Sequence, residues 1–232
     1  GTAMRSLTAA LAFLGGEYSL AGIPRMHERP IGDLVDALRS VGAQVEYLGN
    51  EGYPPLKIGQ PSLDFSQPIR VKGSVSSQFL TALLMAAPLA VAQSDTGGGI
   101  EVEGTLISQP YIAITLDMME KFGVLVRHDE HWQRFVIQQG AQYESPGDFH
   151  VEGDASSASY FLALGTIAGG PIDIQGVGAL SVQGDVQFAK VMELMGAQVT
   201  YLSNSLEVTG KNVAAGERLN AFDLDFNLIP DA

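Results

Sequence analysis

The sequence predicts an α/β (α+β) protein built from repeated βαβαββ units, each folded around a buried helix. Three observations favour this fold class. One order of helices and strands recurs three times along the 232 residues. Each repeat opens with a helix that is apolar nearly all round, as in TALLMAAPLA at 81–90, which is typical of a helix buried on all sides. Each repeat continues with a helix that carries one apolar stripe, followed by alternating strands.

Landmark glycines keep the three repeats in register. Gly1, Gly73 and Gly153 open the repeats, and glycines at equivalent positions lie 72 to 82 residues apart. Two further sets follow the middle strand and close the second helix: Gly22, Gly104 and Gly176, then Gly42, Gly123 and Gly196. This spacing is too long for a solenoid repeat and suits a small α/β subdomain.

The second helix of each repeat is amphipathic, with apolar residues at i, i+3, i+4 and i+7. The stripes consist of Ile31, Leu34, Val35, Leu38 and Val41 in the first repeat, and of Phe188, Val191, Met192 and Met195 in the third. Each of these helices should end at its glycine, which can adopt the left-handed C-cap conformation.

The repeat pattern is incomplete at both ends of the chain. Strands at 69–73 and 149–153 introduce the second and third repeats, whereas the first repeat starts directly at a helix. After the third repeat, residues 222–232 supply another strand and the first residues of a helix. We therefore expect a fragment truncated at both ends. The alternative is a natural protein with frayed ends, which would leave strand edges unpaired and a buried helix uncapped.

Composition excludes several classes of function. No apolar run approaches the roughly 18 residues of a membrane span, so we expect no membrane partner. The formal net charge of −13 argues against a nucleic-acid partner, because phosphate binding needs a basic surface. Cysteine is absent, which excludes disulfides, thiolate metal sites and cysteine nucleophiles from this segment. It also fits a reducing compartment, and we expect a cytoplasmic location.

Basic residues are concentrated at the start of the chain. Arg5, Arg25, Arg29 and Arg39 precede the second repeat, whereas few lysines or arginines follow residue 150. A local basic cluster in an acidic protein suggests a pocket for a small anion. Scattered, solvated surface charge is the alternative interpretation.

The openings of the buried helices concentrate small and hydroxyl residues. They are Gly1 and Thr2 in the first repeat, Ser74, Ser76, Ser77 and Gln78 in the second, and Ser156 and Ser157 in the third. Free backbone N–H groups and the positive end of the helix dipole make each opening a candidate anion site. The alternative is plain N-capping, for which the same residue types are preferred. In the third repeat Asp154 would repel an anion, so that helix should only be capped.

Arg29 stands out in the loop before the second helix of the first repeat. Pro30 follows it, which favours an extended conformation at Arg29 and should aim the side chain outward from a rigid corner. The alternative is a surface arginine that pairs with Glu28 or Asp33.

Ser108 and Tyr111 occupy the equivalent corner of the second repeat. Asp231 lies at the opening of the last, incomplete helix. Its carboxylate could carry a proton in a cleft, or it could simply cap the helix.

These stretches resemble, in order and over the whole chain, the signatures of the 5-enolpyruvylshikimate-3-phosphate synthase family. They are GTAMR at 1–5, RMHERPIGDLVDALRSVGA at 25–43, GSVSSQFLTALLMAAPLA at 73–90, GTLISQPYIAITLDMM at 104–119, GDASSASYF at 153–161 and NLIPDA at 227–232.

The resemblance implies an enolpyruvyl-transferase-like fold of two domains, each made of three such units with the buried helices pointing at an interdomain cleft. Residues 1–150 would hold two units of the N-terminal domain, the first incomplete at its start. Residues 151–221 would hold one unit of the C-terminal domain, and 222–232 the start of a further, truncated unit. The parent protein would be a monomer.

The family is a transferase of the shikimate pathway, which leads to the aromatic amino acids. It moves the enolpyruvyl group of phosphoenolpyruvate to the 5-hydroxyl of shikimate 3-phosphate and releases phosphate. The resemblance implies addition through a tetrahedral intermediate and then elimination, with no metal and no cofactor. It implies two small anionic substrates as partners, and glyphosate as an analogue of phosphoenolpyruvate.

The resemblance also implies roles for individual residues. Contacts to shikimate 3-phosphate are implied for Thr2, Ser76, Ser77, Gln78, Ser108, Tyr111 and Asp231. Contacts to phosphoenolpyruvate are implied for Gly1, Arg29 and Gln78. Asp231 would be the catalytic base that acts on the 5-hydroxyl.

The chain departs from the family pattern in two respects. Ser6 stands where the family commonly has proline, which frees the backbone of the turn that carries Gly1 and Thr2. The family's N-terminal lysine–serine pair, its C-terminal glutamate and its later arginines and lysine have no counterpart in this segment. We therefore expect no turnover from the segment alone.

Two other interpretations are weaker. The sister enolpyruvyl transferase that acts on UDP-N-acetylglucosamine shares the repeat, but it uses a cysteine that would fall within this span. A non-catalytic paralogue that binds a partner or a sugar phosphate would not need to retain Arg29, the run at 76–78 and Asp231.

Overall fold

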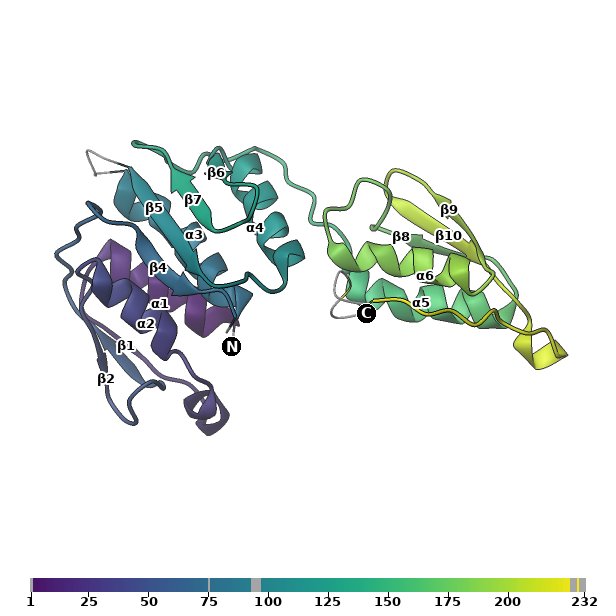
Figure 1. The fold of residues 1–232 in the computed structure, drawn as a ribbon, viewed down its shortest axis with the longest axis horizontal. Coiled ribbons are helices and arrows are strands. Elements are labelled where there is room, and N and C mark those ends of the chain that lie inside the picture. The colour runs from purple at the N-terminus through teal and green to yellow at the C-terminus, as the bar shows by residue number, and fades with distance from the viewer. Residues whose placement is uncertain (1, 75, 93–96, 226–228, 230–232) are drawn as a thin grey trace. The chain divides into compact units, whose positions relative to one another are not determined.

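The computed structural model describes residues 2–74, 76–92, 97–225 and 229 of the chain. The chain divides into two compact units, Gly1–Gly147 and Asp148–Ala232, which we call unit 1 and unit 2. In Figure 1 each unit has its own strands packed on its own helices. None of the helices in the described ranges combines the length and the apolar character needed to cross a membrane.

Unit 1 begins with a repeat of two helices and three strands. They are α1 (Thr2–Leu14), β1 (Tyr18–Leu20), the short 3-10 helix η1 (Pro24–Glu28), α2 (Gly32–Ser40), β2 (Val45–Tyr47) and β3 (Leu56–Ile58). The strands form an antiparallel sheet in the order β1-β3-β2. Val45, Leu56 and Ile58 are buried on its inner face, because alternate side chains of a strand share one face.

The second repeat of unit 1 is a complete βαβαββ unit. It consists of β4 (Ile69–Lys72), α3 (Ser77–Val91), β5 (Gly98–Glu103), α4 (Gln109–Lys121), β6 (Val126–His128) and β7 (Arg134–Ile137). The sheet order is β4-β5-β7-β6, with β4 and β5 parallel and the other pairs antiparallel. The helix α3 is the crossover that parallel strands require.

Unit 2 repeats the arrangement of helices and strands. It consists of α5 (Ala155–Ala168), β8 (Ile172–Gln175), η2 (Gly184–Gln187), α6 (Phe188–Leu194), β9 (Gln198–Tyr201), β10 (Ser205–Thr209) and η3 (Val213–Ala215). Its antiparallel sheet has the order β8-β10-β9, which matches β1-β3-β2 in the first repeat. The predicted α/β fold class and its threefold repeat are therefore confirmed.

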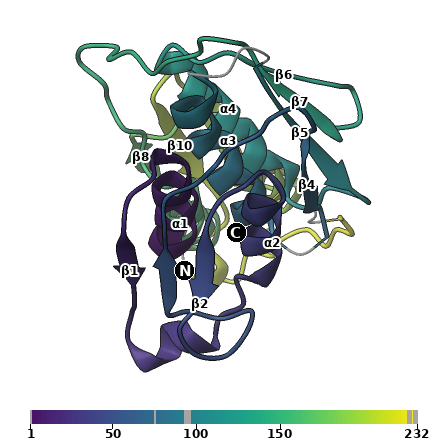
Figure 2. The ribbon, with the colours of Figure 1, turned by 90° about the vertical axis from the view of Figure 1, so that its left-hand side faces the viewer.

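The helix α3 lies at the centre of unit 1. The buried residues on α3 are Phe79, Leu80, Ala82, Leu83, Leu84, Ala86, Ala87, Pro88, Ala90 and Val91. The helices α1, α2 and α4 and the strands β5 and β7 pack around it (Figure 2). Burying one large apolar side chain contributes roughly 1.5–3 kcal/mol, so the covering of α3 contributes substantially to the stability of unit 1.

The amphipathic second helices are confirmed. All five residues of the α2 stripe, Ile31 through Val41, are buried. On α6, Val191 and Met192 are buried, while Phe188 and Met195 are half-buried. The glycines that close these helices, Gly42, Gly123 and Gly196, all have φ between +85° and +100°, as a left-handed cap requires.

The prediction that every first helix is buried on all sides holds for α3 except at Met85, which is 45% exposed, and is wrong for α1 and α5. Leu7 and Leu14 of α1 are about half exposed, and α5 exposes Tyr160, Phe161, Leu164 and Ile167. The difference follows from the neighbours. The helices α1, α2 and α4 and the strands β5 and β7 surround α3. Within unit 2 the described elements η2, α6, β8, β10 and η3 pack on α5 and leave that apolar face uncovered.

The strand predicted at 149–153 does not form. Gly153 N donates to Gly176 O at 2.7 Å, one residue beyond the equivalent of Glu103 O, which accepts from Gly73 N in the second repeat. Val151, however, is 83% exposed, whereas Ile69 and Val71 at the equivalent positions of β4 are buried. The apolar alternation of Phe149 and Val151 is present, but Val151 is not covered by the described residues, so burial does not favour a strand here.

The strand predicted after residue 222 is also wrong in its described part. Residues 222–225 are irregular, and both Phe222 and Leu224 are exposed, so neither face of the segment is buried. The helix opening predicted at Asp231 lies outside the described residues.

Gly42 should be the least replaceable glycine of unit 1. An alanine Cβ there would lie 1.9 Å from Ser62 O, in addition to the strain of φ +94°. Gly104 has a similar φ of +81° but open space around a Cβ. A left-handed alanine costs about 1–2 kcal/mol and forced overpacking about 1–3 kcal/mol more. We expect Gly104→Ala to lose about 1 kcal/mol of unfolding free energy and Gly42→Ala at least twice that.

Urea unfolding followed by tryptophan fluorescence checks this prediction. Trp132 is the single tryptophan of the chain and lies in unit 1, so its signal reports that unit. Equal losses in the two variants would show that Ser62 yields and that the close approach does not constrain the turn.

Candidate functional site

The N-termini of α3 and α4 lie at the same edge of the four-stranded sheet of unit 1. The parallel strands β4 and β5 pair up to Lys72 and Glu103, their last residues. The chain then enters α3 after β4 and α4 after β5. Because the carboxyl ends of parallel strands meet at one edge, both helices present their N-termini there, which is where ligands of α/β sheets commonly bind.

A close approach of the backbone holds these two openings together. Gly73 N donates to Glu103 O at 3.0 Å, and Ile107 N donates to Gly73 O at 3.3 Å. A Cβ on Gly73 would lie 2.8 Å from Thr105 O and 2.6 Å from a methyl of Val102. Only glycine lets the loop before α4 pass this close to the opening of α3.

The opening of α3 carries Ser76, Ser77 and Gln78. Ser76 is the N-cap residue in an extended conformation, and its Oγ accepts from Gln78 N at 3.3 Å. All three residues are half-buried, which leaves part of each side chain accessible. Ser76 therefore caps the helix, as the alternative interpretation proposed. Ser77 and Gln78 add further polar groups at the same turn.

The opening of α4 is strained. Ser108 is its N-cap residue with φ +57° and ψ +44°, a left-handed conformation that non-glycine residues rarely adopt. Its side chain makes no capping hydrogen bond to the helix. Left-handed residues of this kind cluster at functional sites. Tyr111, one turn later, is half-buried and donates its N–H to Ser108 O at 3.1 Å.

Arg5 connects α1 to the α3 opening. Its Nη1 donates to Gln78 Oε1 at 2.5 Å and lies 3.4 Å from Ser76 Oγ. The guanidinium carbon lies 4.8 Å from the centre of the Phe79 ring. Nη2 donates to Pro30 O at 3.4 Å, so the corner that carries Arg29 is attached as well.

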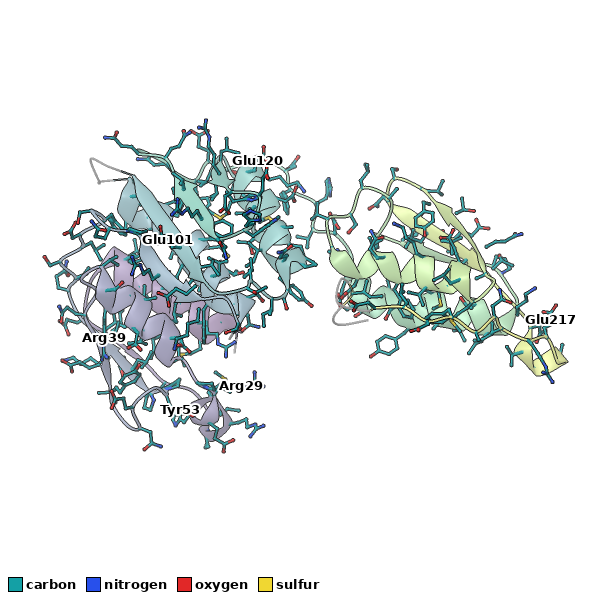
Figure 3. The ribbon with its side chains drawn as sticks, viewed as in Figure 1. Arg29, Arg39, Tyr53, Glu101, Glu120 and Glu217 are labelled. Carbon is teal, nitrogen blue, oxygen red and sulfur yellow. The ribbon has the colours of Figure 1, made fainter. Side chains whose placement is uncertain are left out.

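Arg29 has the extended conformation predicted for a residue before proline, with φ −96° and ψ +121°. The two carboxylates that could have neutralised it bind other cations. Glu28 pairs with Arg25, and Asp33 pairs with Lys72 at 2.8 Å. Arg29 is exposed and lies on the side of unit 1 away from Arg39 in Figure 3.

Arg5 and Arg29 form a cationic pair at this edge. Burial lowers the pKa of the Arg5 guanidinium, and the positive charge of Arg29 lowers it further. No carboxylate among the described residues makes a salt bridge with either arginine. The edge is therefore suited to an anion.

The opening of α5 in unit 2 is different in character. Asp154 caps it: Oδ1 accepts from Ser156 N at 3.2 Å, and Ser157 Oγ donates to Oδ2 at 2.5 Å. The hydroxyl of Ser157 holds the pKa of the Asp154 carboxyl below its usual value. Ser156 Oγ donates to Asp185, and Ala155 N donates to Gln183 Oε1 at 2.9 Å. Asp154 therefore caps α5 as expected, and the absence of an anion site at this opening stays a prediction.

The structure thus brings most of the predicted site residues to one edge of unit 1. Ser76, Ser77, Gln78, Ser108, Tyr111 and Arg29 lie there, and Thr2 is the first residue of α1, whose first turn reaches α3 through Arg5. Gly1 and Asp231 lie outside the described residues. Groups of three or more His, Cys, Asp or Glu side chains that could hold a metal are absent from the described ranges.

Arg5 is missing from the predicted site, although it belongs to the basic cluster recognised in the sequence. One sequence signal could have singled it out. A cation in the first turn of a helix opposes the helix dipole, so its presence there needs a compensating role.

The chain is similar to known proteins of one family. The family model of EPSP synthase (3-phosphoshikimate 1-carboxyvinyltransferase) matches residues 1–232. The chain is 61% identical to a 3-phosphoshikimate 1-carboxyvinyltransferase of Bordetella parapertussis over its whole length, covering 52% of that relative. It is 58% identical to one of Cupriavidus necator, of which it covers 53%. The chain spans about half the length of these curated relatives.

Solved structures show the same fold. EPSP synthase from Acinetobacter baumannii matches 91% of this chain with a TM-score of 0.70 at 21% identity, over 46% of its own length. The enolpyruvyl transferase NikO from Streptomyces tendae matches 88% of this chain with a TM-score of 0.61 at 15% identity, over 46% of its own length. With a family match over every residue and a repeat fold shared with these structures, the chain belongs to the EPSP synthase family.

Proposed function

We propose that this chain supplies part of an enzyme that transfers the enolpyruvyl group of phosphoenolpyruvate to the 5-hydroxyl of shikimate 3-phosphate and releases phosphate. Relatives of about 60% identity carry the name of this activity. In the proposal, residues 1–150 contribute two units of an N-terminal domain, and residues 151–221 contribute one unit of a C-terminal domain.

One observation carries the proposal. The Arg5–Arg29 pair lies beside the α3 opening with no carboxylate partner among the described residues, in a chain of net charge −13. Leaving two neighbouring cations without a counter-charge costs free energy in the empty site. An anionic ligand removes that cost, and both proposed substrates are anions.

The two substrates take different parts of this edge in the proposal. Shikimate 3-phosphate binds at the openings of α3 and α4, through Ser76, Ser77, Gln78, Ser108 and Tyr111, with Thr2 beside it. Phosphoenolpyruvate binds Arg29, Gln78 and Gly1. Hydroxyl and backbone N–H donors suit a phosphate monoester, while the planar guanidinium of Arg29 suits a carboxylate or phosphate.

The reaction is an addition followed by an elimination. Asp231 takes the proton of the 5-hydroxyl as the hydroxyl oxygen attacks C2 of phosphoenolpyruvate, and C3 of phosphoenolpyruvate receives a proton. Loss of a proton from C3 and departure of phosphate from C2 then restore the double bond. The hydrogen-bond donors at the N-termini of α3 and α4, together with Arg29, hold both anions in place, so that the attack proceeds within one complex.

The proposal is tested by extending the chain to the length of its relatives and measuring phosphate release from phosphoenolpyruvate. We expect release that depends on shikimate 3-phosphate. Binding of both compounds without release would instead indicate a non-catalytic sugar-phosphate-binding protein.

Arg29→Lys in the extended protein should lower kcat/KM at least about tenfold, equal to about 1.4 kcal/mol. Lysine keeps the charge but loses the planar, bidentate donor. Arg25→Lys is the matched control, because Arg25 lies four residues earlier and is already paired with Glu28. Steady-state kinetics should leave that control near the parent value. A harmless Arg29→Lys would remove Arg29 from the site.

Shikimate 3-phosphate should bind this 232-residue chain weakly, with a Kd in the millimolar range. Each hydrogen bond to a charged group contributes roughly 1.5–3 kcal/mol, and the α3 and α4 openings supply only part of the donors. In a ¹⁵N NMR titration we expect shifts at Ser76, Ser77 and Tyr111. Ser156 and Ser157 are the internal control, because Asp154 and Asp185 occupy their donors. Shifts confined to the α5 opening would contradict the assignment.

A further inference from the structure

Arg5 is placed where an arginine is electrostatically unfavourable. It lies in the first turn of α1, at the positive end of the helix dipole, and it is half-buried beside the charge of Arg29. Without a carboxylate partner in the described part of the chain, its position needs another explanation. The contacts of its guanidinium provide one.

The contact with Gln78 determines how that amide is turned. A guanidinium carries donors and no acceptor, so Gln78 must present its carbonyl oxygen Oε1 to Arg5. The two N–H groups of Gln78 Nε2 then point away from Arg5. With a partner that can both donate and accept, for example a hydroxyl, both orientations of the amide would be compatible with a hydrogen bond.

Two further contacts fix the plane of the guanidinium. Its carbon lies 4.8 Å from the ring centre of Phe79, which is itself buried in the core of unit 1. Nη2 donates to Pro30 O, which directly follows Arg29 in the chain. One side chain of α1 therefore sets the positions of an α3 residue and of the Arg29 corner, which are 73 and 25 residues away from it.

We propose that Arg5 is a positioning residue of the anion site: it turns the Gln78 amide so that the Nε2 donors face the bound anion, and it holds the Arg29 corner beside them. This inference rests on the proposed function for the identity of the anion. It predicts that lysine cannot replace Arg5, because one ammonium group cannot span Gln78, Ser76 and Pro30 in a fixed plane.

Arg39 provides a matched control within the same unit. Its guanidinium also donates to a backbone oxygen, Val45 O, at 2.9 and 2.6 Å, and also packs on an aromatic ring, 5.0 Å from the centre of Tyr47. It lies away from Arg29 in Figure 3. Any general effect of exchanging a packed arginine for lysine should therefore appear in Arg39→Lys as well.

The geometric part of the inference is tested on the 232-residue chain without substrate. In ¹H–¹⁵N spectra, Arg5→Lys should shift or broaden the side-chain NH2 signals of Gln78, and Arg39→Lys should leave them unchanged. Unchanged Gln78 signals in Arg5→Lys would overturn the inference while leaving the proposed function intact. The Trp132 indole signal of both variants is the folding control: it should stay at its position in the parent chain if each variant is folded.

The functional part is tested by a double-mutant cycle in the protein extended to the length of its relatives. We expect Arg5→Lys to lower kcat/KM about tenfold alone, but less than about threefold in a Gln78→Ala background, because the effect acts through Gln78. Gln78→Glu keeps an acceptor for Arg5 and removes the outward donors, so it should lose activity and remain folded. Additive losses, or equal losses in Arg39→Lys, would overturn the inference. Absence of turnover in the parent protein would instead contradict the proposed function.

Discussion

The covering of one apolar helix determines the arrangement of unit 1. The α3 helix has apolar side chains on nearly every face, and water is excluded only when α1, α2, α4 and the sheet surround it. Because α3 connects the parallel strands β4 and β5, its N-terminus is placed at the carboxyl edge of the sheet. The same edge receives the start of α4, and α1 reaches it through Arg5. The site is therefore a consequence of how the core is closed.

The three repeats share a backbone pattern and differ in the chemistry of their helix openings. At the α3 opening, Arg5 contacts Ser76 and Gln78, and the acidic residues near Arg29 in the sequence, Glu28 and Asp33, pair with Arg25 and Lys72. At the α5 opening, Asp154, Asp185 and Gln183 occupy the serine hydroxyls and two backbone N–H groups. A helix dipole is common to both openings, so it cannot by itself select an anion. The neighbouring charges decide between an anion site and a capped helix.

The sequence predicted those features that depend on neighbouring residues along the chain. The α2 stripe, the left-handed glycines after the second helices and the extended conformation of Arg29 follow from local rules. The sequence did not predict which helix faces are covered, because the exposure of Phe161 or Leu14 depends on elements that pack there. It predicted a strand at 149–153 that does not form. It also gave no sign of the contact between Arg5 and Gln78, which spans 73 residues. The salt bridge of Asp33 with Lys72 rather than with Arg29 likewise depends on the tertiary structure.

The central claim is that unit 1 presents an anion site at the α3 opening and that unit 2 does not present one at the α5 opening. A crystal structure of the protein extended to the length of its relatives, with shikimate 3-phosphate bound, tests this most directly. The account predicts the ligand in contact with Ser76 and Ser77, with Gln78 Nε2 turned toward it and Oε1 toward Arg5. A ligand bound at Ser156 and Ser157, with the α3 opening empty, would contradict it.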